Sequence, residues 1–294
     1  MSDTLASLRR KIGGAVQLET VVRTMKAVAA SSIGQYEAAV RSLADYQRSV
    51  ELGLGVCFRH GGVGENSPRR TGTEIIGAIV FGSDQGLVGQ FNETMADFVE
   101  KTLTAMPGKK KIWTVGERIE ACLADAGLPL AGRFTVPSSI AAITSLVGQL
   151  QLETETRGAD ACSELYVFHT CPGARGLNNA VSQRLLPLDA KWQRNVAKNS
   201  WPTKNAPQLF GHEESTVRGF VREYLFISLF KACAESLASE NASRLAAMQR
   251  AEKNIDSLMT DLNRTFYRLR QSSIDEELFD VVAGFNALSG PSRT

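Results

Sequence analysis

Apolar residues in the C-terminal part of the chain recur at alternating intervals of three and four positions. They are Leu245, Met248, Ile255, Met259, Leu262, Phe266 and Leu269. A repeat of this kind is the seam of an α-helix that coils around a second helix. Residues 208–290 contain no proline, so we expect a long coiled-coil helix over Glu213–Leu288 within this segment. Glu252 is the one charged position in the seam.

A second proline-free segment lies at the N-terminus and carries a weaker seam with the same spacing. Its apolar positions are Leu8, Ile12, Ala15, Val22, Ala29, Ile33, Tyr36, Val40 and Leu43. Glu19 and Lys26 fall on the same seam and interrupt its apolar character. We predict a helix over Thr4–Gly53, within a coiled-coil segment 1–56. It should pair antiparallel with the C-terminal helix, because the middle of the chain joins one to the other.

The middle of the chain, 72–190, alternates strand-like and helix-like runs. We expect strands over Glu74–Phe81, Lys110–Val115 and Glu164–Thr170, and helices over Asn92–Met106, Glu117–Ala126 and Pro137–Thr156. Such alternation predicts an α/β layer on a mostly parallel, Rossmann-like sheet. His60–Thr73 has the composition of a linker, and Asp189–Pro207 has no pattern that predicts an element. The predicted fold class is therefore α/β, with a long antiparallel coiled coil and a central α/β domain.

The C-terminal helix is expected to outreach its N-terminal partner by about one to two dozen residues. This overhang starts at Ser272 and carries an apolar stripe made of Ile274, Leu278, Val281, Val282, Phe285 and Leu288. Soluble monomers avoid exposing such a stripe, so we predict a partner that grips the tip. The alternative is that the tip folds back onto the chain's own body.

Composition and charge exclude several classes of protein. The 294 residues include 33 basic and 31 acidic side chains. The net charge of +2 lacks the strong overall positive charge that is typical of nucleic-acid-binding proteins. Three His and five Cys, with no C-x-x-C spacing, predict no metal site. No stretch approaches the ~18 uninterrupted apolar residues of a membrane span.

One glycine-rich loop, Gly82–Gly89, follows the first predicted strand. Loops of this kind can hold a phosphate at a helix N-terminus, but this one lacks both the P-loop ending and the G-x-G-x-x-G spacing. A tight strand-to-helix turn is therefore favoured, and we predict no catalytic residues and no cofactor. The loop keeps open the alternative of an α/β nucleotide-binding enzyme with helical oligomerisation arms. A purely structural coiled-coil protein is a further possibility.

Several short motifs occur in order along the chain. They lie at Leu8–Ile12, Met25–Ser31, Ser83–Gly89, Glu235–Leu245, Arg268–Ile274 and Glu277–Gly284. Together they resemble the gamma subunit of F-type ATP synthases, the central rotor shaft. The corresponding family patterns are I-R-R-R-I, M-K-M-V-A-A-S, S-D-R-G-L-C-G, E-x-x-A-S-E-x-x-A-R-M, A-R-Q-A-x-I-T and E-I-x-E-I-V-x-G. Each motif alone is modest, whereas their shared order and separations make the resemblance specific.

The resemblance implies a non-catalytic shaft inside a hexamer of alternating alpha and beta subunits. Such a shaft also contacts an epsilon subunit and the membrane ring of c subunits. It couples ion flow through the c-ring to nucleotide synthesis or hydrolysis, because its asymmetry drives each beta site through open and closed states.

The resemblance also implies roles for individual residues. Arg270 with Gln271, and Arg244 with Glu240, would contact the catch loops of the beta subunits, and the apolar tip would turn in a bearing. Arginine suits such contacts because its fork binds carboxylates bidentately. Met25 would pack near a beta subunit or against the C-terminal helix. The N-terminus has no signal-peptide core, and no transit peptide precedes the first predicted helix. Together with the resemblance, this implies a peripheral protein on the cytoplasmic face of a bacterial inner membrane.

Overall fold

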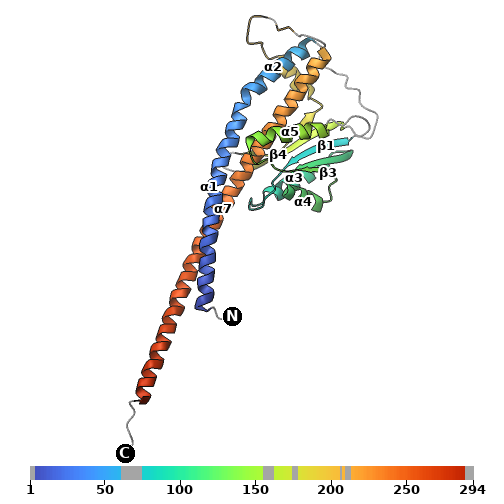
Figure 1. Ribbon diagram of the computed structural model, residues 1–294. Helices are drawn as coiled ribbons and strands as arrows, with labels where there is room; N and C mark the ends of the chain where they lie inside the picture. The colour runs from blue at the N-terminus through green and yellow to red at the C-terminus, as the bar shows by residue number, and fades with distance from the viewer. Residues whose placement is uncertain are drawn as a thin grey trace, which may run out of the picture. The chain divides into compact units, whose positions relative to one another are not determined.

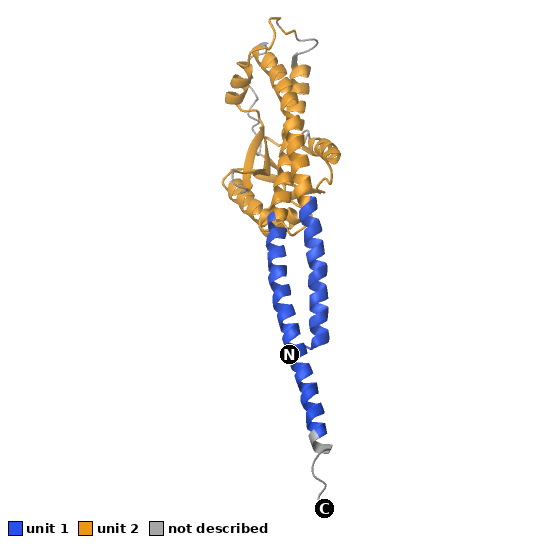
Figure 2. Cartoon of the chain, turned by 90° about the vertical axis from the view of Figure 1, so that its left-hand side faces the viewer, with its two compact units in different colours: residues 1–28, 246–294 blue, residues 29–245 orange. Residues whose placement is uncertain are grey.

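The computed structural model describes residues 4–60, 75–154, 162–173, 178–205, 207–208 and 213–288, except for the side chains of 60, 213 and 286–288. The predicted linker lies outside the described residues apart from the backbone of His60. The chain forms two compact units, shown in Figure 2. Unit 1 comprises residues 1–28 and 246–294, and unit 2 comprises residues 29–245.

Unit 2 is built on a sheet with the strand order β3-β2-β1-β4-β5 among the described residues (Figure 1). The strands are β1 (Ile75–Phe81), β2 (Lys109–Val115), β3 (Leu130–Phe134), β4 (Glu164–Pro172) and β5 (Asn178–Leu186). All neighbouring pairs are parallel except β4 and β5, which are antiparallel. The predicted mostly parallel α/β sheet is confirmed.

Helices cover both faces of this sheet. Successive residues of a strand point to opposite sides, so the apolar residues of β1 contribute to two separate cores. Ile76 and Val80 of β1 pack with α3 (Phe91–Thr104) and α4 (Glu117–Asp125). Ile79 and Phe81 belong to the opposite core. That second core is completed by α5 (Ile140–Thr154) and by the unit 2 parts of the long helices α1 (Leu5–Ser42) and α7 (Glu213–Leu288).

The predicted single N-terminal helix is wrong at one point, because α1 ends at Ser42 and α2 (Ala44–His60) begins after it. The Ser42 hydroxyl donates a 2.8 Å hydrogen bond to the Ala39 carbonyl oxygen, a local bond that competes with regular helix pairing. Helix α2 then runs past Gly53, where the prediction placed the helix end. A Cβ at Gly53 would lie 2.4 Å from the Phe220 ring, so the glycine permits close approach to α7.

Three elements were not predicted, namely β3, β5 and α6 (Ala190–Ala197). Strand β5 is rich in polar residues, and its antiparallel pairing with β4 holds it extended. Helix α6 begins where the Asp189 carboxylate accepts a hydrogen bond from the Trp192 N–H, and it buries Val196. The division into segments 1–56, 72–190 and 208–290 stays a prediction. Within the described ranges, no helix combines the length and the apolar character that crossing a membrane requires.

Candidate functional site

In unit 1 the beginning of α1 runs beside α7 (Figure 2). Leu8, Ala15 and Val22 are buried on α1 at every seventh residue, as a coiled-coil seam requires. The pairing is antiparallel, because residues later in α1 meet residues earlier in α7. Arg9 lies over the ring of Phe266, with 5.5 Å from its guanidinium carbon to the ring centroid, whereas Lys26 meets Glu252. The predicted antiparallel coiled coil is thereby confirmed.

The charged positions of the predicted seams are each paired. Lys26 Nζ lies 2.5 Å from Glu252 Oε2, and Arg23 Nη2 lies 2.6 Å from Glu19 Oε1. The hydrogen bond from Lys26 is the main cause that lowers the pKa of the Glu252 carboxyl. Met25 is half-buried beside Lys26 in the same unit.

The end of α7 extends beyond its partner helix within unit 1. Helix α1 begins at Leu5, about one turn before Arg9, and Arg9 is level with Phe266. From Gln271 to Leu288, α7 therefore continues for about 27 Å at 1.5 Å per residue with no second helix beside it in the described part of the unit.

The predicted tip residues are exposed on this lone stretch of helix. They are Ile274, Leu278, Val281, Val282 and Phe285, and the unpredicted Phe279 is the most exposed of the group at 71%. The side chain of Leu288 lies outside the described residues. Arg270 and Gln271 are exposed where the paired part of α7 ends. The fold thus brings the predicted tip and the Arg270–Gln271 pair together on one free segment.

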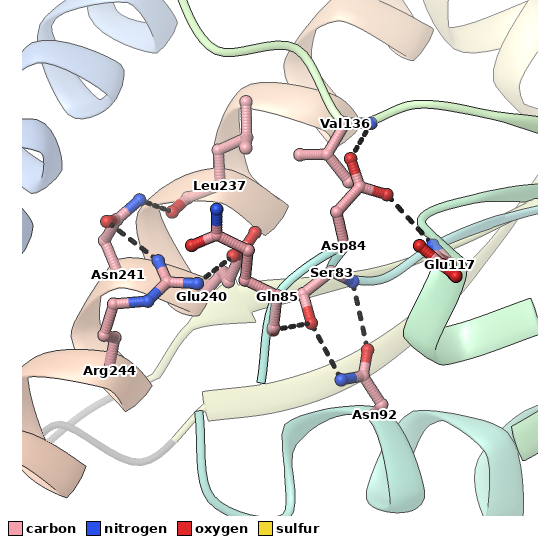
Figure 3. A network of polar contacts seen from close by, with 10 residues as sticks. All are labelled: Ser83, Asp84, Gln85, Asn92, Glu117, Val136, Leu237, Glu240, Asn241 and Arg244. Carbon is pink, nitrogen blue, oxygen red and sulfur yellow. Dashed lines mark hydrogen bonds and ion pairs between the residues drawn. The ribbon is translucent and has the colours of Figure 1, made fainter. Parts of the chain in front are cut away.

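Arg244 and Glu240 occupy a different environment, in unit 2. Arg244 Nη2 lies 2.5 Å from Glu240 Oε1, and the two side chains are only 12% and 6% exposed. Burial is the largest influence on the Glu240 carboxyl and raises its pKa, while Arg244 acts in the opposite direction. Arg244 also donates to Asn241, whose amide donates to the Leu237 carbonyl oxygen (Figure 3). The structure therefore holds this predicted contact pair inside the chain.

The loop after β1 lies close to this pair, and Asp84 contributes a negative charge that raises the pKa of Glu240. One Asp84 carboxylate oxygen accepts a 2.9 Å hydrogen bond from the Glu117 N–H at the start of α4. The other accepts a 2.9 Å bond from the Val136 N–H. Ser83 and Asn92 exchange two further hydrogen bonds, so the loop joins three neighbouring segments.

These bonds attach the glycine-rich loop to the segments around it. At the N-terminus of α4, the Asp84 carboxylate occupies the position where an anion can accept hydrogen bonds from free N–H groups. Gly116, with a φ of 123°, brings the chain so close to Ser83 that a Cβ would lie 2.8 Å from the Ser83 carbonyl oxygen. That the loop is a tight strand-to-helix turn and not a phosphate site stays a prediction.

Sequence reasoning missed a polar pair between β4 and α7. His169 Nε2, on β4, lies 2.9 Å from Glu235 Oε2, and the histidine side chain is 6% exposed. The two residues are 66 positions apart, and no local spacing marks them. Only the contact between β4 and α7 identifies the pair.

Paired long helices in unit 1 and an α/β sheet in unit 2 define the class of coiled-coil proteins that carry an α/β domain. A sequence profile of the ATP synthase family matches residues 4–288, and the chain belongs to this family. The chain is 26% identical over 304 residues to the ATP synthase gamma chain of Granulibacter bethesdensis. The alignment covers 97% of this chain and 99% of that protein.

Solved structures show the same fold. The rotor of the Euglena gracilis mitochondrial ATP synthase matches with a TM-score of 0.64 and 14% identity over 92% of this chain and 98% of that chain. The central stalk and c-ring structure of the Tetrahymena thermophila enzyme contains a match with a TM-score of 0.58 and 20% identity, over 79% and 99% of the two chains. The predicted resemblance to the gamma subunit is confirmed.

Proposed function

We propose that this chain is the rotary shaft of an F-type ATP synthase. In this role it couples ion flow through a membrane c-ring to nucleotide synthesis or hydrolysis at beta subunits, and it is itself non-catalytic. The observation that carries the proposal is the lone end of α7, which exposes an apolar stripe in a chain of the ATP synthase family. An exposed stripe of this kind marks an interaction surface.

The geometry of unit 1 fits a shaft that transmits torque. A shaft can drive its partners only if it contacts them differently in each state. The lone α7 segment presents Leu278 and Phe279 on different sides, next to the acidic residues Glu276 and Glu277, so its faces differ as it turns. The partners that we propose are the alpha and beta subunits around this segment, together with an epsilon subunit and the c-ring.

Among the predicted contacts, Arg270 and Gln271 are accessible for binding to beta catch loops. Both side chains are exposed. Arg244 differs, because it can reach a beta carboxylate only by leaving Glu240. We therefore propose Arg270 and Gln271 as the primary contact and the Arg244–Glu240 pair as one that opens during rotation. Met25 contributes packing near the beta subunit.

We place the protein at the membrane periphery, on the cytoplasmic face of a bacterial inner membrane. The similarity to the ATP synthase gamma chain of Granulibacter bethesdensis, over nearly the whole length of both chains, supports a place in an ATP synthase complex.

The first experiment tests the tip. The chain is assembled with alpha and beta subunits and the membrane sector, and proton or sodium pumping is measured together with ATP hydrolysis. Removing residues 272–294 should reduce coupling strongly, whereas removing 289–294 alone should have a much smaller effect. Assembly and coupling that are unchanged without 272–294 would show that no partner grips the tip.

The second experiment tests the docking pair. Arg270→Ala with Gln271→Ala should lower torque and turnover, while the control Lys101→Ala, on the exposed surface of α3, should leave both unchanged. Equal torque and turnover in the double variant and the control would remove the docking role. Tight nucleotide binding by the isolated chain would instead support the alternative enzyme function.

A further inference from the structure

Unit 2 contains a half-open cavity of about 520 Å³ between α1, the β4–β5 hairpin and α7. Its apolar walls include Val40 of α1, Val181 of β5, and Ala232 and Ala238 of α7. Cavities that hold small organic ligands have volumes of about 300 to 1,000 Å³ and mostly apolar walls with a few polar groups. This cavity has the size and the lining of a small-molecule site.

Two ion pairs border the cavity, and in both the acid is the more enclosed partner. Glu37 is 45% exposed and Arg41 69%, with 3.8 Å between Oε2 and Nη1. Glu235 is 20% exposed and Lys231 47%, with 3.9 Å between Oε1 and Nζ. Both separations exceed hydrogen-bonding distance, so neither base saturates its acid.

Of the two acids and two bases that line the cavity, Glu235 is the least exposed. Its Oε2 lies 2.9 Å from His169 Nε2, which fixes the carboxylate in place. Burial raises the pKa of the neighbouring Cys171 thiol, and the negative charge of Glu235 raises it further. Lys231 opposes this effect but is the smaller influence.

We propose that this cavity binds a small organic cation, an ammonium or guanidinium group on a compact apolar body, with Glu235 as its anionic partner. The cationic group replaces the distant Lys231 at the carboxylate. The apolar body packs against the Val40 and Val181 side of the cavity. This site is separate from the proposed shaft contacts on α7 of unit 1, so its test is independent of them.

The proposal is tested by isothermal titration of the full chain with three ligands of one shape. Cyclohexylammonium should bind, while cyclohexanecarboxylate and cyclohexanol should each bind at least about tenfold more weakly, because only the cation complements a carboxylate. Binding should also slow the alkylation of Cys171, which lines the cavity. Absence of cyclohexylammonium binding, or equal binding of the carboxylate, would overturn the proposal.

Two variants locate the site. Glu235→Gln should weaken cyclohexylammonium binding at least about fivefold, while its amide can still hydrogen-bond with His169. The control Glu100→Gln, the same change on the exposed face of α3, should leave binding unaltered. Gln183→Trp fills the cavity from an exposed position on β5 and should abolish binding. Full affinity in Gln183→Trp, or in folded Glu235→Gln, would exclude this cavity as the site.

Discussion

Lys26 Nζ lies 2.5 Å from Glu252 Oε2, so two charged residues that interrupt the apolar seams of α1 and α7 meet each other. Each side chain is about one quarter to one third exposed, which leaves the pair partly shielded from water. A lone charge in a helix seam is unfavourable, whereas a matched pair satisfies both partners and can specify the register of the helices. The pair therefore contributes to the antiparallel alignment of unit 1.

Replacing one residue of this pair should lower the thermal unfolding midpoint, whereas replacing both with apolar residues should not. Lys26→Met and Glu252→Gln should each lower the thermal unfolding midpoint, because each leaves one seam charge or polar group without its partner. Lys26→Leu combined with Glu252→Leu should restore or raise it, since an apolar seam replaces the pair. Circular dichroism melts check this, with Lys253→Met as an exposed control. A double variant less stable than both single variants would contradict the expectation.

The same pair should make stability depend on acid pH. The pKa of Glu252 is lowered from its ordinary value of 4.5, so the folded state prefers the ionised carboxylate. The stabilisation is present above the ordinary value and is lost as the pH falls through the lowered pKa. The stability gap between the natural chain and Lys26→Met should be full at pH 7 and shrink below about pH 4.5. Urea unfolding across this range measures it, and a constant gap down to pH 3 would contradict the pairing.

Arg244→Met should be strongly destabilising at neutral pH. It leaves the buried Glu240 carboxylate without its cation, and breaking a buried pair costs about 3 to 5 kcal/mol. The pKa of Glu240 is already raised by burial and should rise further, so the folded state gains a proton as the pH falls. A raised pKa gives stability that is lost as pH rises, and the cost of the variant should therefore be smaller at pH 5 than at pH 7.

The control for this prediction is Arg218→Met. Arg218 forms the same type of pair with Glu214 on α7, one helical turn apart, but both side chains are largely exposed. Its removal should change the free energy of unfolding by less than about 1 kcal/mol. Equal effects of Arg244→Met and Arg218→Met in urea unfolding would show that burial does not determine the contribution of the Glu240 pair.

Asp84→Ala should weaken unit 2 by about 2 kcal/mol, because the N–H groups of Glu117 and Val136 lose a charged acceptor. Asp84→Asn keeps one side-chain oxygen and should cost about half as much. Denaturant unfolding checks both, with Asp97→Ala on the exposed face of α3 as the control. An Asp84→Ala variant as stable as the control would remove the structural role assigned to the loop.

Features that depend on local sequence could be predicted without the structure. The expected helix over Glu213–Leu288 coincides with α7, because a proline-free stretch with three-four apolar spacing favours one continuous helix. The apolar runs that became β1, β2 and β4 are buried in the sheet, and their composition alone favours strands. The exposed tip also followed from the difference in helix lengths.

Tertiary structure alone decided which distant groups meet. Strand β5 is polar and is extended because β4 pairs with it, and the burial of Glu240 and Arg244 depends on elements packed around α7. Lys26 and Glu252 were each visible as seam defects, yet only the antiparallel alignment makes them partners across 226 positions. The physical reason is that periodicity is a local property of the chain, whereas desolvation and charge pairing depend on neighbours that the folded chain brings together.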